Sequence, residues 1–315
     1  MIQYLVILLD DTSVSFCHYG NTKTQRKLIP LDTLKAGLLY AMKENLNIQF
    51  VYPVYPLPKE YDEVIDSVGH VNIKPAACAA DADIVVFDDI VTLSSFAEFS
   101  KGIAYVLRTD RRTLFDGVAR VLPVLHKVER LNIVITDFDE FAEDDFKAYA
   151  DALQTLAKEV EKVYASGMSV QLNLLTDRMM LDKMNNCGAG DTSLTLAPNG
   201  KFYVCPAFYL SADGYAVGDL ENGLDIRNAQ LYRLDHAPLC RNCDAYQCKR
   251  CIWLNRKTTL EVNTPGHEQC VAAHLERNAS RNLLLAIRKH GEFLPEVDEI
   301  KEITYLDPFD VRKDW

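Results

Sequence analysis

The chain has 315 residues and a formal net charge of −11; 48% of its residues are hydrophobic and 25% are charged. This composition is typical of an ordinary globular protein long enough for one large or two medium cores, and it excludes a disordered chain. The acidic balance disfavours a nucleic-acid partner, because such binding depends on lysine and arginine side chains that neutralise phosphates.

The first apolar segment, Met1–Leu9, is too short for a membrane segment and lacks the flanking residues of a targeting segment. No basic region precedes it, no cleavage site of small residues follows it, and it runs directly into two aspartates. No apolar run in the chain approaches the ~20 residues that span a bilayer. We therefore expect a buried first strand, no membrane partner and a cytoplasmic protein.

From residue 1 to about residue 177, short apolar segments alternate with helical ones. Continuous runs of Val, Ile and Leu are typical of strands covered on both faces. The predicted strands are Gln3–Leu9, Ile48–Tyr52, Ile84–Phe87, Ile103–Leu107, Asn132–Ile135 and Ser169–Leu174, with His70–Ile73 as an additional candidate. The predicted helices are Leu31–Leu46, Lys59–Val68, Arg111–Val128 and Asp144–Ala165. Repeated β–α units imply an α/β fold with a parallel sheet, either open and doubly wound or a partial barrel.

Acidic residues follow most of the predicted strands, at the face where parallel α/β domains bind ligands. They are Asp10, Asp11, Asp88, Asp89, Asp110, Asp137, Asp139 and Asp177. Aspartate is also among the best helix N-caps, and the loops from strand to helix require caps. We expect capping and solvation to explain most of these residues.

Seven of the nine cysteines are concentrated between residues 187 and 270. They are Cys187, Cys205, Cys240, Cys243, Cys248, Cys251 and Cys270. Thiolates packed this densely repel one another and oxidise readily unless disulfides, zinc or an iron–sulfur cluster hold them. Two Cys-x2-Cys pairs favour a metal, because such pairs converge on one ion from a tight turn. Disulfides are the weaker option in a chain that otherwise looks cytosolic.

The other possible ligands near this cluster have simpler explanations. His236 and His267 flank the cysteines, but each is more typical of a surface or hydrogen-bonding histidine. Cys17 stands alone in the first loop, and Cys78 lies among alanines. A lone cysteine is more often a small packed residue than a ligand.

The order of motifs around the cysteines resembles the SPASM domains of radical S-adenosylmethionine peptide maturases. The resemblance begins with a hairpin over Leu194–Pro206, continues at Gly218-Asp219-Leu220 and ends at the Cys240–Cys251 cluster. Each of the last two cysteine gaps is one residue shorter than in the family signature. The resemblance implies auxiliary 4Fe–4S clusters, one or two in number, with zinc as the alternative.

The first loop departs from that family. Radical enzymes carry Cys-x3-Cys-x2-Cys after the first strand, whereas this loop keeps only Cys17, with Asp10 and Val14 at the other two spacings. The second strand ends in Tyr52-Pro53-Val54-Tyr55-Pro56, without the Gly-Gly-Glu that takes the amino group of the cofactor. One thiolate cannot replace three cluster ligands, so the barrel is predicted to be degenerate and unable to cleave S-adenosylmethionine.

A degenerate barrel followed by a SPASM-like region is similar to the CXXX-repeat peptide maturase family. The resemblance implies three regions: a radical-SAM-like partial (β/α)6-type barrel (1–180), a SPASM-like cysteine-rich Fe–S domain that ends in a helix (181–291), and an acidic, aromatic tail (292–315). It also implies one cluster on Cys240, Cys243, Cys248 and Cys270, and another on Cys187, Cys205 and Cys251. The eighth ligand position falls at Leu181, beside Asp182, so a peptide cysteine, water or Asp182 would complete the second cluster.

The expected function is that of an Fe–S-bearing accessory or maturase protein in the modification of a ribosomally made cysteine-repeat peptide. The implied partners are that precursor peptide and a radical S-adenosylmethionine maturase. Two alternatives remain open: a zinc-stabilised scaffold that binds peptide without a redox role, and a self-sufficient enzyme that uses a cluster or the acidic face for non-radical chemistry.

Overall fold

A computed structural model describes residues 1–211 and 214–301, which divide into two compact units. Among the described residues, the first unit is formed by residues 1–86 and 187–237, and the second by residues 87–186 and 238–301. Each unit therefore combines two separate stretches of sequence. The predicted succession of three domains stays a prediction, and its tail lies outside the described residues from residue 302 onward.

The sheet of the first unit is mostly parallel. Its strands are β1 (Tyr4–Leu8), β2 (Asn47–Val51), β3 (His70–Pro75), β4 (Ile84–Phe87), β8 (Ser193–Leu196) and β9 (Phe202–Tyr203). β1 pairs in parallel with both β2 and β8, the order continues through β3 to β4, and β9 pairs antiparallel with β8. Leu5, Ile7 and Leu8 of β1 are fully buried, as expected of a strand inside a sheet that is covered on both faces.

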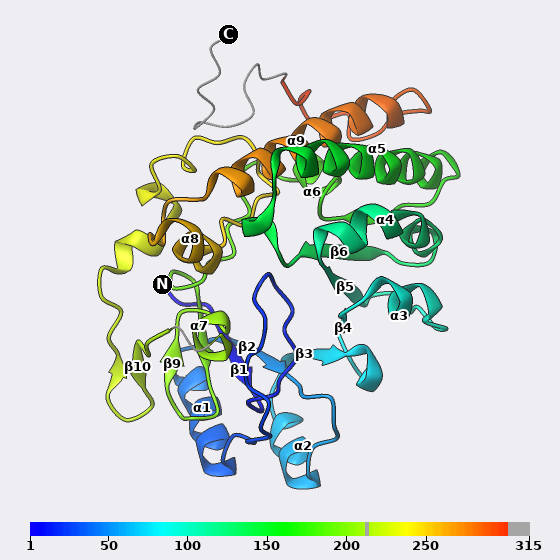
Figure 1. Cartoon of the computed structure of the whole chain (residues 1–315). Helices are drawn as coiled ribbons and strands as arrows, with labels where there is room; N and C mark the ends of the chain where they lie inside the picture. The colour runs from blue at the N-terminus through cyan, green and yellow to red at the C-terminus, as the bar shows by residue number, and fades with distance from the viewer. Residues whose placement is uncertain (212–213, 302–315) are drawn as a thin grey trace. The chain divides into compact units, whose positions relative to one another are not determined.

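The first unit also contains three α-helices and a small β-ribbon (Figure 1). The helices are α1 (Leu31–Lys43), α2 (Lys59–Ile65) and α7 (Ala207–Leu210), and the ribbon joins β10 (Gly218–Asp219) to β11 (Gly223–Leu224). Gly37 lets α1 approach β8 closely, since a Cβ on Gly37 would stand 2.4 Å from Cδ2 of Leu196. Gly218 has a similar role in the ribbon, because a Cβ there would stand 2.1 Å from the Gly223 carbonyl oxygen.

The second unit contains three parallel strands and six α-helices among its described residues. The strands are β5 (Ala104–Thr109), β6 (Arg130–Ile135) and β7 (Gln171–Leu172), with β6 between the other two. The helices are α3 (Ile90–Ser95), α4 (Arg111–Val121), α5 (Glu143–Ala165), α6 (Asp177–Met180), α8 (Ile252–Thr259) and α9 (His267–Ile287). The two longest helices, α5 and α9, run alongside each other (Figure 1).

Two apolar stripes explain why α5 and α9 pack together. On α5, Tyr149, Leu153 and Leu156 are buried at helical spacing. On α9, Leu283 and Ile287 are buried one turn apart. The helix expected at the end of the cysteine-rich region is thus present, and it includes Cys270 in its first turn.

All seven predicted strand segments form parallel strands, His70–Ile73 among them. Three of the four predicted helices end earlier than predicted, and the fourth, α5, begins one residue earlier and ends as predicted. The predicted strand Ser169–Leu174 is reduced to two residues because the chain turns at Thr176, whose backbone N–H donates to the Leu172 carbonyl at 2.8 Å. The short helices α3 and α8 were not predicted. The fold is thus mixed α/β with mostly parallel strand pairing, and the predicted hairpin over Leu194–Pro206 is present as β8 and β9.

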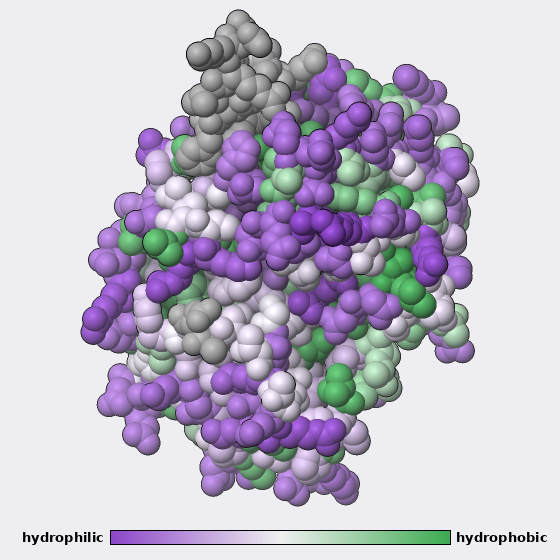
Figure 2. Space-filling model, viewed as in Figure 1, coloured by the Kyte–Doolittle hydropathy of each residue, from purple (hydrophilic) through white to green (hydrophobic). Residues whose placement is uncertain are grey.

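Polar side chains cover most of the molecular face in Figure 2, and hydrophobic residues appear there as small, separate patches. Single exposed hydrophobic side chains of this kind are ordinary for a globular protein. Within the described ranges, no helix has the length and apolar character needed to cross a bilayer.

Candidate metal centre

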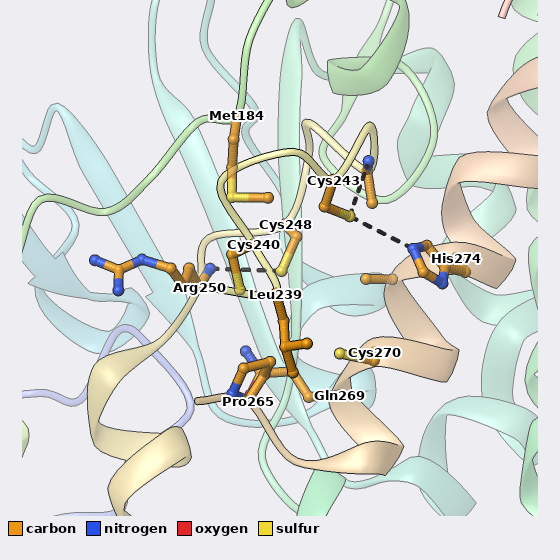
Figure 3. A pocket seen from close by; sticks show the side chains of 12 residues that line it. Met184, Leu239, Cys240, Cys243, Cys248, Arg250, Pro265, Gln269, Cys270 and His274 are labelled. Atoms are coloured by element: carbon orange, nitrogen blue, oxygen red, sulfur yellow. Dashed lines mark hydrogen bonds between the residues drawn. The ribbon is translucent and has the colours of Figure 1, made fainter. Parts of the chain in front are cut away.

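Four of the seven predicted ligand cysteines line one cavity in the second unit (Figure 3). Cys240, Cys243 and Cys248 come from the loop that precedes α8, and Cys270 comes from the first turn of α9. A tight turn brings the first pair together, since the Cys243 N–H donates to the Cys240 carbonyl at 3.1 Å. Residues as much as 30 positions apart therefore present their thiols to a common space.

The rest of the lining is largely apolar. Met184, Leu239, Ala245, Pro265 and Ala273 contribute side chains to it. The cavity has a volume of about 30 Å³, which is two to three times the space that one buried water requires. It therefore has room for a group of a few atoms among its sulfur atoms.

Burial in this cavity disfavours the thiolate form of the cysteines. It raises the pKa of the Cys240 thiol to about 11 and that of the Cys248 thiol to about 12, and it also raises the pKa of Cys243. At neutral pH, these thiols are protonated unless a cation binds them. A metal group that takes up the thiolates would release protons and offset the cost of burying negative charge.

Backbone N–H groups point at two of the sulfur atoms. The N–H of Ala245 lies 3.5 Å from Sγ of Cys243, and the N–H of Arg250 lies 3.5 Å from Sγ of Cys248. Hydrogen bonds to sulfur are among the features that set the properties of metal–thiolate centres. The loop thus already presents donors to two of the predicted ligands.

His274 is a polar cavity residue that the sequence analysis did not identify. Its Nε2 lies 3.4 Å from Sγ of Cys243, and the residue is only 5% exposed. Burial lowers its pKa to about 4, an effect that Asp244 opposes and Arg277 strengthens. The signal for this residue was the spacing Cys270-x3-His274, which places both side chains on one face of a helix.

A buried ion pair lies directly beside Cys243. The Arg277 side chain is fully buried and donates to Oδ2 of Asp244 from Nε at 3.0 Å and from an Nη atom at 2.7 Å. Arg178 lies 3.7 Å from the same carboxylate oxygen and over the ring of Tyr246, 4.2 Å from its centroid. Two guanidinium groups thus share one carboxylate, and both act to lower the pKa of the Cys243 thiol, against burial and Asp244, which raise it.

A second buried network holds the middle of the cysteine loop against α9 and α5. Gln247, between Cys243 and Cys248, donates its amide to the Ala273 carbonyl at 2.7 Å and to Glu276 at 3.2 Å. The Tyr149 hydroxyl donates to the other oxygen of Glu276 at 2.6 Å. Burial raises the pKa of Glu276 to about 7, although both hydrogen bonds act to lower it.

The remaining predicted ligands do not line this cavity. Cys251 stands at the N-cap of α8 in the second unit, whereas Cys187 and Cys205 belong to the first unit, exposed and half-buried respectively. Across residues 1–211 and 214–301, no three or more His, Cys, Asp or Glu side chains converge as they would on a single metal ion. The ligand roles of all seven cysteines stay predictions.

Most acidic residues at the strand ends have structural partners, and the predicted capping is observed for two of them. Asp89 caps α3 and Asp110 caps α4, each accepting a hydrogen bond from a backbone N–H of the first turn. The other carboxylates form ion pairs: Asp88 with Arg108, Asp137 with Arg111, Asp139 with Lys257, and Asp177 with Arg130. Capping and pairing therefore account for this acidic face in the second unit.

Comparison with known proteins identifies the fold. No protein-family model matches the sequence, and no curated protein sequence matches it. The fold is similar to that of anSMEcpe. The structure of anSMEcpe with bound AdoMet aligns at a TM-score of 0.63 and 11% identity, over 90% of this chain and 99% of that one.

Further structures of anSMEcpe give the same result. The complex with AdoMet and the Cp18Cys peptide aligns at a TM-score of 0.61 and 12% identity, over 92% of this chain and 100% of that one. The complex with AdoMet and the Kp18Cys peptide also aligns at 0.61, over 90% and 99% of the two chains. The likeness extends over nearly the whole of both chains, and at this identity it concerns the fold.

Proposed function

We propose that this chain is an iron–sulfur-bearing accessory or maturase protein that takes part in modifying a ribosomally made cysteine-repeat peptide and does not itself cleave S-adenosylmethionine. One observation carries the proposal. Cys240, Cys243, Cys248 and Cys270, which the SPASM resemblance groups as the ligands of one cluster, line the same cavity.

The residues around that cavity fit an anionic metal–thiolate group. Four thiols supply the donors, much of the remaining lining is apolar, and the guanidinium groups of Arg178 and Arg277 lie close to Cys243 around Asp244. Positive charge favours the thiolate, the form that binds metal, over the thiol. A 4Fe–4S cluster held by these four thiolates would supply one-electron redox chemistry.

Iron–sulfur ligation in place of a single zinc ion is proposed from the SPASM resemblance, which groups these four cysteines as the ligands of one 4Fe–4S cluster. Four thiolates are the usual ligands of such a cluster, and each of them binds a different iron atom. The four cysteines line one cavity from two separate segments.

The loop after β1 supports the absence of S-adenosylmethionine cleavage. Its side chains form hydrogen bonds within the protein and are not arranged to hold a cluster. Asp10 is fully buried and accepts a hydrogen bond from the Thr12 backbone N–H at 2.7 Å. The Ser13 hydroxyl donates to the Val51 carbonyl at 2.8 Å, and the Tyr209 hydroxyl donates to Asp11. The positions of two cluster ligands in active enzymes are thus occupied by buried Asp10 and Val14.

The peptide partner is supported by the likeness of fold to anSMEcpe, whose structures hold the Cp18Cys and Kp18Cys peptides. From the SPASM resemblance we propose that a second cluster, where it forms, has one ligand position that a peptide cysteine, water or Asp182 completes. Titrating the anaerobic protein with a cysteine peptide and its serine counterpart tests ligation by the peptide cysteine. A change in the EPR or visible spectrum with the cysteine peptide alone would support it, and identical spectra would refute it.

One observation favours the alternative of a zinc-stabilised, peptide-binding scaffold. His274 adds a nitrogen donor beside Cys243, and mixed cysteine and histidine sets are typical zinc ligands. The two proposed functions predict different metals and a different colour of the purified protein. A colourless protein that holds zinc and no sulfide, after anaerobic expression with iron supplied, would favour the scaffold.

The function is tested by incubating the anaerobically purified protein with S-adenosylmethionine and a strong reductant. We expect no 5′-deoxyadenosine from this protein alone, and peptide modification only when a radical maturase and a cysteine-repeat peptide are added. Modification that proceeds equally well without this protein would contradict the accessory role. Release of 5′-deoxyadenosine that disappears in Cys17→Ser would contradict the degenerate first loop.

A further inference from the structure

Helix α9 contacts the cysteine loop with side chains from three successive turns. Cys270 and His274 line the cavity, Ala273 and Glu276 accept the hydrogen bonds of Gln247, and Arg277 pairs with Asp244. These contacts hold the loop at Cys243 and at two residues that follow it, Asp244 and Gln247. His274 differs from the others, because it contacts a predicted ligand atom directly.

The surroundings of His274 bear on which ring nitrogen carries the proton. Its Nε2 lies 3.4 Å from Sγ of Cys243, and its Nδ1 is buried without a hydrogen-bond partner within the described part of the chain. A metal-bound thiolate has no proton and can only accept a hydrogen bond. The contact with Cys243 is therefore favourable in the loaded centre only when the imidazole carries its proton on Nε2.

We propose that His274 is a positioning residue that donates an Nε2–H hydrogen bond to the Cys243 thiolate in the metal-loaded centre. This inference rests on the proposed metal–thiolate function. The hydrogen bond withdraws negative charge from one sulfur, so it stabilises the more negative, reduced state of a cluster more than the oxidised state. Its removal should lower the reduction potential.

The test compares His274→Phe, which has no donor, with His274→Gln, whose side-chain amide retains one. His267→Phe, at the first residue of α9 and outside the cavity lining, is the matched control. Iron, sulfide and zinc are measured first in every protein. The midpoint potential is then determined by an anaerobic titration that is followed by EPR.

We expect His274→Phe to retain its iron while the ratio of oxidised to reduced cluster at a fixed potential rises tenfold, which equals about 59 mV for one electron. The His274→Gln variant should recover at least half of this shift, and His267→Phe should match the wild type. Equal potentials in all four iron-loaded proteins would overturn the role of His274 while leaving the proposed function intact.

If the protein binds zinc instead, ¹⁵N NMR of the histidine ring supplies the readout. A proton on Nε2 of His274, together with faster zinc loss to a chelator in His274→Phe than in His274→Gln, would support the hydrogen bond. A proton on Nδ1 would overturn it. A wild-type protein that holds neither iron nor zinc would overturn the proposed function and this inference together, and the metal analysis distinguishes that case.

Discussion

The buried carboxyl of Glu276 should make the stability of the protein fall as the pH rises. Its pKa is raised to about 7 from an ordinary 4.5 because burial disfavours the carboxylate. A group that holds its proton more tightly in the folded state stabilises the protein. This stabilisation is fully present below the unfolded pKa and is lost as the pH rises through the folded pKa. Over this interval of about 2.5 pH units, at about 1.4 kcal/mol per unit, the loss is about 3 kcal/mol.

The variant Glu276→Gln tests this prediction because it keeps the shape of the side chain and cannot titrate. The free energy of unfolding is measured in urea at pH 5, 6, 7 and 8 for the anaerobic wild type, for Glu276→Gln and for the exposed control Glu261→Gln. Protonation of metal ligands affects all three proteins alike and cancels in the differences. We expect Glu276→Gln to gain about 3 kcal/mol relative to the wild type between pH 5 and 8. Parallel pH profiles for the two proteins would refute the reasoning.

Three further predictions concern the cysteines and the acidic strand ends. Cys243→Ser should lose metal and destabilise the second unit, since structural metal binding contributes on the order of 10 kcal/mol to stability. Metal analysis and thermal unfolding test this, with Cys78→Ser as the control. An unchanged metal content in Cys243→Ser would refute the prediction. Cys17→Ser should leave metal content and peptide modification unchanged, and a loss of either would show that Cys17 is functional. Asp110→Ala should lower the free energy of unfolding by about 1 kcal/mol as a lost helix cap without affecting peptide binding, whereas weaker peptide binding at unchanged stability would assign Asp110 to a ligand site.

The parallel strands were predictable because their residues are covered on both faces. The short apolar run Ile84–Phe87, for example, indicates a strand, and the buried face of α5 follows from the spacing of its apolar residues. The parallel pairing of β8 with β1 was not predictable in the same way. It joins Leu194 to Leu5 across almost 190 residues, and no local pattern specifies a partner at that distance.

The candidate centre was predictable for its sulfur donors and not for its surroundings. Cys-x2-Cys spacing identifies Cys240 and Cys243 locally, because a tight turn is encoded within the motif. The contacts of Glu276 with Tyr149 and Gln247 depend on how α5, α9 and the loop pack together. In the sequence, Glu276 and Arg277 resemble the polar face of an amphipathic helix, so their burial gave no signal.

The most direct test of the central claim is metal analysis of a variant in which Cys240, Cys243, Cys248 and Cys270 are all replaced by serine. Wild-type protein, purified anaerobically with iron supplied, should be brown and should contain iron and acid-labile sulfide in equal amounts. The fourfold variant should lose the iron and sulfide that are bound in this cavity. A control variant with both Cys17→Ser and Cys78→Ser should retain all of its iron and sulfide. Full retention of iron and sulfide by the fourfold variant would contradict the assignment of a cluster to these four cysteines.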